Sequence, residues 1–267
     1  PTPVSAANPR MAGLGAADIE RLHAAARAIR DRQPALADRL LGEVLAAHPA
    51  HAEALRLRAI GQLHRRRPDL AIATLGDALR THPGDALLHC ELGNACNATG
   101  DQAAAIAAWR EAVRLDPAQG VAWFNLGRAH QLRGETAEAI DALKQARALA
   151  PEVLPAAILL GDALVHSGDY DAAQAQYRDA LRLHPGCGDA WRGLANIKTR
   201  PLTDADADAL RAQLARPGIA DADAIAMGHA LGKLEEDRDQ PARAFAAFVA
   251  ANARQRRLAP YRLDALE

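Results

Sequence analysis

The chain has 267 residues, of which 49% are hydrophobic and only 3% aromatic, and its formal net charge at pH 7 is -1. This near-neutral balance argues against general binding of nucleic acid or of acidic membranes, for which a basic surplus is expected. The sequence has neither a signal peptide nor an apolar run of roughly 18 residues that could span a membrane. Cys90, Cys96 and Cys187 lack metal-ligand spacing. We therefore expect a reducing, cytoplasmic setting, no nucleic-acid partner and no membrane partner.

Residues 1–17 precede any periodic pattern and are rich in proline and glycine, so we expect them to form a flexible leader. After them, prolines recur at intervals of 34 residues: Pro49, Pro83, Pro117, Pro151 and Pro185. Such a period is typical of repeat architectures. It defines five units, at residues 18–51, 52–85, 86–119, 120–153 and 154–187, with a partial unit from residue 188.

Glycine recurs at two positions of the unit, and each position predicts a different role. A glycine inside a helix costs roughly 0.5 to 1 kcal/mol relative to alanine, so the first set indicates a neighbouring helix too close for a side chain: Gly93, Gly127 and Gly161. The second set can end a helix in the left-handed conformation: Gly100, Gly134 and Gly168. The first two units carry Arg32 and Arg66 there, followed by Pro34 and Pro68 in the predicted first turn of the next helix. Each unit is therefore expected to be a helical hairpin.

The clearest unit contains Trp123, Leu126, Gly127, His130, Ala139, Leu143 and Pro151 at the spacing of a tetratricopeptide repeat. The chain resembles that family over at least residues 18–199. The resemblance implies an all-α fold, a right-handed α-solenoid of tetratricopeptide helical hairpins. It also implies a concave groove lined by the first helix of each hairpin.

In this family the groove positions correspond to ten residues of the chain: Asn94, Asn97, Phe124, Asn125, Arg128, Gln131, Asp162, His166, Arg192 and Asn196. Asparagine carries both a donor and an acceptor, so a row of asparagines can pair with the backbone of an extended peptide. A solvated helix face is the alternative interpretation. The groove lacks the lysines with which some family members hold a peptide C-terminus.

Two other groups of residues have the composition of a binding site. Arg65, Arg66 and Arg67 form a basic run for which a solvated turn is the favoured interpretation and docking of an acidic partner the alternative. His48, His82 and His184 each precede a repeat proline, and this spacing places them too far apart to bind one metal ion. We find no catalytic constellation and expect no metal site and no cofactor.

Residues 200–267 depart from the 34-residue register and are expected to form an irregular helix, a seventh hairpin and a tail. Thr203 and Asp206 have the spacing of a capping box that opens a helix ending near Ala215. The hairpin is expected to begin near Ile225, with Leu231-Gly232, Pro241, Ala244 and Phe248 in the repeat positions.

Residues 188–267 also resemble the junction that precedes the catalytic domain of bacterial tetratricopeptide-repeat sulfotransferases. The resemblance lies in the order of Trp191-x2-Leu194-Ala195-Asn196, Thr203-Asp204, Ala230-Leu231-Gly232-Lys233, Ala244-Phe245, Asn252 and Tyr261. It implies a substrate-recognition and dimerising module. The cofactor 3'-phosphoadenylyl sulfate would belong to a downstream domain, because the chain contains no phosphosulfate-binding loop.

Two functions of different class remain. The first is a non-catalytic scaffold, not an enzyme, that binds an extended peptide or protein partner in the groove. The second is the sulfotransferase-associated module. Phe245, Phe248 and Val249 on the last predicted helix further indicate a possible homodimer through the C-terminal helices.

Overall fold

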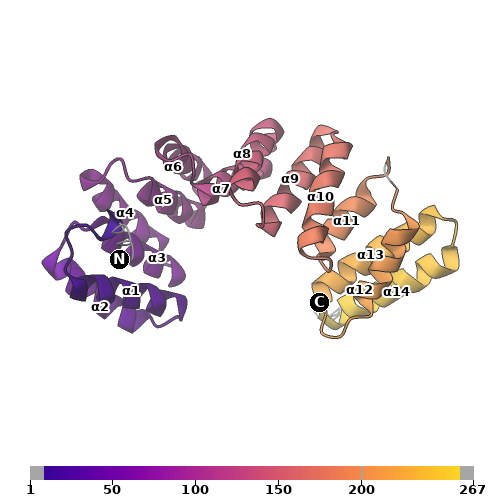
Figure 1. The fold of residues 1–267 in the computed structure, drawn as a ribbon, viewed down its shortest axis with the longest axis horizontal. Coiled ribbons are helices and arrows are strands. Elements are labelled where there is room, and N and C mark those ends of the chain that lie inside the picture. Colours follow the sequence, from indigo (N-terminus) through magenta and orange to yellow (C-terminus); the bar gives the residue numbers. More distant parts are fainter. Residues whose placement is uncertain (1–8, 200, 259–267) are drawn as a thin grey trace, which may run out of the picture. The chain divides into compact units, whose positions relative to one another are not determined.

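The computed structural model describes residues 9–199 and 201–258, and this part of the chain contains fourteen α-helices and no strand (Figure 1). A 3-10 helix, η1 (Pro9–Met11), comes first. The α-helices are α1 (Ala16–Arg30), α2 (Pro34–Ala47), α3 (Ala52–His64), α4 (Pro68–Thr81), α5 (Ala86–Thr99), α6 (Gln102–Leu115), α7 (Gly120–Leu132), α8 (Thr136–Leu149), α9 (Leu154–Ser167), α10 (Tyr170–Leu183), α11 (Gly188–Asn196), α12 (Asp204–Leu214), α13 (Asp221–Asp237) and α14 (Pro241–Leu258). The chain divides into two compact units, unit 1 at residues 1–129 and unit 2 at residues 130–267.

Within each unit, consecutive helices pack as antiparallel hairpins that stack on their neighbours. In unit 1, α1 packs on α2, α3 on α4 and α5 on α6, while α2 contacts α3 and α4 contacts α5. In unit 2, α9 pairs with α10 and α13 with α14, while α8 contacts α9 and α10 contacts α11. The prediction of an all-α solenoid of helical hairpins is confirmed.

The helix ends follow the signals in the sequence. The Asp85, Asp101 and Asp169 carboxylates accept hydrogen bonds from backbone N–H groups in the first turns of α5, α6 and α10. Gly100 and Gly168 end α5 and α9 with φ of 87° and 83°, values that a residue with a side chain rarely adopts.

Close approach of an aromatic ring explains the glycines inside the helices. A Cβ atom added at Gly93 would lie 2.5 Å from the Trp109 ring, and one at Gly161 would lie 2.6 Å from the Tyr177 ring. The same relation recurs in the last hairpin, where a Cβ at Gly232 would lie 2.5 Å from Phe248. The predicted tight contact is thus confirmed at Gly93 and Gly161, and the side chain that fills it comes from the second helix of each hairpin.

Two boundaries differ from the expectations. The predicted leader, residues 1–17, includes η1 and the start of α1, and Arg10 of η1 donates a hydrogen bond to Glu53 of α3. Residues 1–8 lie outside the described part. The last hairpin begins at Asp221 rather than near Ile225. The capping box of Thr203 and Asp206 is confirmed at the start of α12.

Among the helices described, none combines the length and the apolar character that crossing a membrane would require.

Candidate functional site

A continuous row of paired polar side chains, here called the ladder, runs across α3 and α5 in unit 1. Arg56 lies at its centre, with its guanidinium 2.7 Å from a Glu53 carboxylate oxygen and 3.2 Å from one of Glu91. Arg10, from η1, donates to Glu53 at 2.6 Å and to both oxygens of Asp85 at 3.0 and 3.1 Å. The N-terminal segment is therefore held on the first helices of the second and third hairpins.

The ladder continues through the predicted asparagines to α7. Asn94 donates to Glu91 at 3.0 Å, and its carbonyl oxygen accepts from Asn125 at 2.9 Å and from the Trp109 indole at 3.2 Å. Because both acceptor positions of that oxygen are used, Asn94 serves to position Asn125. Sequence reasoning placed Asn94 and Asn125 on one face, and the structure brings them into direct contact.

The electrostatics of the ladder favour ionised side chains. Burial alone would raise the pKa of Glu53, but hydrogen bonds and charges from Arg56 and Arg10 outweigh it and hold the pKa below its ordinary value. Three carboxylates, of Glu53, Asp85 and Glu91, face two guanidiniums. The ladder is thus almost neutralised internally, and its members are hydrogen-bonded to one another.

The other predicted groove residues of unit 1 are more accessible. Asn97 accepts a hydrogen bond from Gln102 at 3.0 Å, and Phe124 is half-buried on α7. Arg128 is exposed, and within the described part of the chain its side chain makes no hydrogen bond or ion pair. Arg128 is therefore the cation of this face that is best placed to meet a partner.

The remaining five predicted residues belong to unit 2, where several are engaged locally. Asp162 accepts a hydrogen bond from the buried Tyr177 hydroxyl at 2.6 Å, so its carboxylate has a packing role. The His166 ring lies 2.7 Å from the Asp162 carbonyl oxygen. Arg192 pairs with Asp189 at 2.9 Å and Asn196 accepts from Lys233 at 3.1 Å, both at exposed positions, while Gln131 is half-buried.

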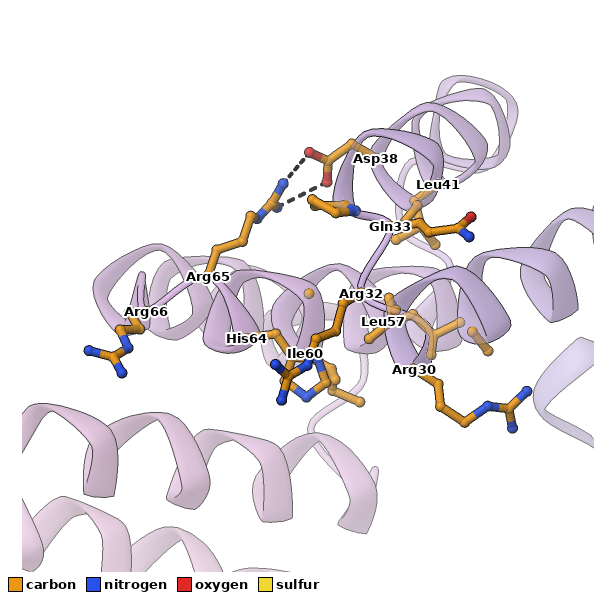
Figure 2. Close-up of a pocket in the computed structure, with 15 residues that line it drawn as sticks. Arg30, Arg32, Gln33, Asp38, Leu41, Leu57, Ile60, His64, Arg65 and Arg66 are labelled. Atoms are coloured by element: carbon orange, nitrogen blue, oxygen red, sulfur yellow. Dashed lines mark hydrogen bonds and ion pairs between the residues drawn. The ribbon is translucent and has the colours of Figure 1, made fainter.

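A second feature of unit 1, here called the turn pocket, lies between the first two hairpins and has a volume of about 760 Å³ (Figure 2). Ile29, Leu41 and Leu57 form an apolar floor, with Ile60 beside them. The rim is basic and includes Arg30, Arg32, His64, Arg65 and Arg66, with Asp38 as its carboxylate. The run at Arg65 to Arg67 indicated charge in the sequence, but only the packing of α1, α2 and α3 reveals the apolar floor beneath it.

The histidines that precede the repeat prolines serve local contacts. The His48 ring lies 3.3 Å from Asp18, and the His82 ring lies 2.7 Å from the Ala50 carbonyl oxygen. No group of three or more metal-ligating side chains occurs among residues 9–199 and 201–258.

Three family models match the chain, two described as "Tetratricopeptide repeat" over residues 22–86 and 132–197 and one described as "TPR repeat" over residues 93–134. No curated protein matches. Among solved structures, PilF of Pseudomonas aeruginosa is 22% identical with a TM-score of 0.59, and the match covers 79% of this chain and 93% of that one. A thermophilic TPR protein of Thermus thermophilus, TTC0263, is 24% identical with a TM-score of 0.53, and the match covers 63% of this chain and 92% of that one. A MamA protein is 23% identical with a TM-score of 0.52, and the match covers 64% of this chain and 94% of that one. At these identities the likeness concerns the fold alone.

Proposed function

Because this chain is a tetratricopeptide repeat protein, we propose that it is a non-catalytic scaffold that holds an extended segment of a partner protein along the first helices of its hairpins. Repeat arrays of this kind bind protein partners through extended surfaces. The observation that carries the proposal is the ladder, which places Asn125 in a fixed orientation next to the exposed Arg128.

The ladder supports peptide binding through preorganisation. Asn125 uses one N–H to reach Asn94, and its carbonyl oxygen and second N–H are left for a ligand within the described structure. An amide that presents one donor and one acceptor can pair with a peptide backbone regardless of the peptide's side chains. The hydrogen bond to Asn94 already holds the Asn125 amide in place. A ligand therefore does not have to order this side chain on binding, and the loss of affinity that such ordering would cause is avoided.

The experiment is affinity capture from native lysate with the wild-type chain and three variants, with bound proteins identified by mass. Arg128→Ala and Asn125→Ala remove the proposed contacts. Arg110→Ala removes an exposed arginine from α6, the second helix of its hairpin, and is the matched control. A partner kept by Arg110→Ala and lost by the other two supports the proposal, provided that their melting temperatures match. Capture of one common set by all four chains would refute it.

Self-association through α14 is a further part of the proposal. Phe245 is 71% exposed and Val249 is 43% exposed on one face of this helix, whereas Phe248 is packed against Gly232. A contiguous exposed apolar patch marks a surface for contact with another protein, and we propose a second copy of this chain as that partner. Light scattering of the wild type and of a Phe245→Ser, Val249→Ser variant should show a concentration-dependent dimer only for the wild type.

A cytoplasmic setting fits the free, buried state of Cys90, Cys96 and Cys187, and we keep it as part of the proposal.

The sulfotransferase-associated module is the second candidate. Support for it comes from residues 188–258, where α11, the capped α12 and the α13–α14 hairpin follow one another in the order that the resemblance requires. The coding sequence downstream of Glu267 decides between the two, because this candidate requires a sulfotransferase domain there. A stop codon at that point would exclude it.

A further inference from the structure

The turns beside the turn pocket differ from those of the next three repeats in the residue that adopts a positive φ. Arg32 and Arg66 adopt φ of 55° and 57°, in the left-handed region that strains an L-residue. The corresponding positions of the next three repeats hold glycine, also at positive φ: Gly100, Gly134 and Gly168. Both strained arginines line the turn pocket.

Strain of this kind persists where another requirement outweighs it, and such places concentrate at binding sites. The third non-glycine residue with positive φ in the described part is Asp239, a type that tolerates this conformation well. Arginine is not among the residue types that adopt this conformation routinely. The presence of arginine where the next three repeats have glycine therefore indicates that the guanidinium at each turn has a role that glycine cannot fill.

The charges on the rim are not equivalent. Arg65 is held by the Asp38 carboxylate through two hydrogen bonds, shown as dashed lines in Figure 2. Arg30 has the Asp31 carboxylate at 3.8 Å. Among the described residues, Arg32 and Arg66 make no side-chain hydrogen bond or ion pair, so the unbalanced positive charge of the pocket resides on these two side chains.

The floor of the pocket supplies the other half of a recognition site. Ile29, Leu41 and Leu57 line the pocket from the hydrophobic core, and Ile60, which is more exposed, lines it beside them. A volume of about 760 Å³ falls within the usual range for ligand sites.

We propose that the turn pocket binds an acidic, amphipathic segment of a partner protein, with an apolar side chain inserted against Ile29 and Leu57 and flanking carboxylates paired with Arg32 and Arg66. Charge complementarity selects this occupant, because carboxylates accept the paired N–H groups of arginine in a geometry that neutral side chains cannot match. The site shares no residue with the ladder, so it is a second binding surface on unit 1.

The test measures fluorescence polarisation of two labelled peptide pools with the full chain. One pool has Asp or Glu alternating with Leu, Ile or Phe, and the other has Asn or Gln in place of the acids. The key variant is Arg32→Gly with Arg66→Gly, which installs the residue that three other repeats carry and therefore leaves the fold intact. The matched control is Arg39→Ala with Arg67→Ala, which removes two exposed arginines of the same hairpins outside the pocket.

We expect the acidic pool to bind the wild type and the control alike, and the glycine variant to bind about tenfold or more weakly, since two charge-assisted contacts are lost. Arg110→Ala removes an exposed arginine that belongs to neither the turn pocket nor the ladder, so it should leave this affinity unchanged. The proposal is overturned if the amide pool binds equally well, if the glycine variant keeps wild-type affinity, or if anionic lipid vesicles bind through these arginines while the acidic pool does not.

Discussion

Replacing Gly161 by alanine should destabilise unit 2, because the Tyr177 ring fills the space next to this glycine. The new Cβ would lie 2.6 Å from the ring, about 1 Å closer than a favourable carbon–carbon contact. The ring is confined, because Gly193 on α11 also lies against it and its hydroxyl is held by Asp162 at 2.6 Å. Only 1% of Tyr177 is exposed, so the ring cannot relieve the clash by moving into solvent.

The expected magnitude follows from two opposing effects. Overpacking of this kind costs about 1 to 3 kcal/mol. Against it, alanine improves the helix by about 0.5 to 1 kcal/mol relative to glycine. We therefore expect the free energy of unfolding to fall by about 1 to 2 kcal/mol. The matched control is Gly76→Ala in α4, where nothing lies within 4 Å of the added Cβ; it should gain about 0.5 to 1 kcal/mol.

Urea denaturation followed by far-ultraviolet circular dichroism measures both variants, with hydrogen exchange of α9 to α11 as the local readout. A double-mutant cycle with Tyr177→Leu isolates the contact, since Gly161→Ala should become neutral or stabilising once the ring is gone. If Gly161→Ala stabilises the wild-type chain as much as Gly76→Ala does, the close-approach explanation of the repeat glycines is wrong.

Three further outcomes are expected. Arg32→Gly and Arg66→Gly should together raise the free energy of unfolding by about 1 kcal/mol in thermal melts, because relief of left-handed strain exceeds the added freedom of the unfolded chain; a fall would contradict the assigned strain. The pKa of Glu53 is lowered in the folded chain, so ionised Glu53 stabilises the fold at pH values above the ordinary pKa of 4.5, and this stabilisation is lost as the pH falls below 4.5. The melting temperature of Glu53→Gln should therefore depend less on acidic pH than that of the wild type. Burial, followed by the charge of Glu91, raises the pKa of Cys90 to about 12, so iodoacetamide at mild alkaline pH should label Cys90 only after denaturant is added.

The fold was predictable because its signals repeat at a fixed period. Proline at each unit end, glycine opposite an aromatic residue and an acidic or proline start to each second helix are local rules, and repetition makes each rule visible above background. The capping box of Thr203 and Asp206 was predictable for a related reason, since both partners lie within one turn.

The sites were less predictable, because they depend on contacts between hairpins. The groove pattern assigned Asn94 and Asn125 to one face, but it did not reveal that Asn94 also hydrogen-bonds to Glu91 and Trp109. Nor did the sequence indicate that Arg10, in the predicted leader, reaches α3 and α5. Apart from Glu91, which is 3 residues from Asn94, these partners lie 15 to 75 residues apart. Only packing decides which of many polar side chains meet.

The ladder and the turn pocket differ in whether their charged side chains are paired, and this difference indicates their roles. In the ladder each charge faces an opposite charge, as a structural network requires. In the turn pocket Arg32 and Arg66 have strained backbones and no side-chain partner in the described structure. Neither property stabilises the fold, and glycine, which three other repeats use, would remove both. Selection for stability alone therefore favours glycine at both turns, whereas selection for an anionic partner favours the arginines that are present.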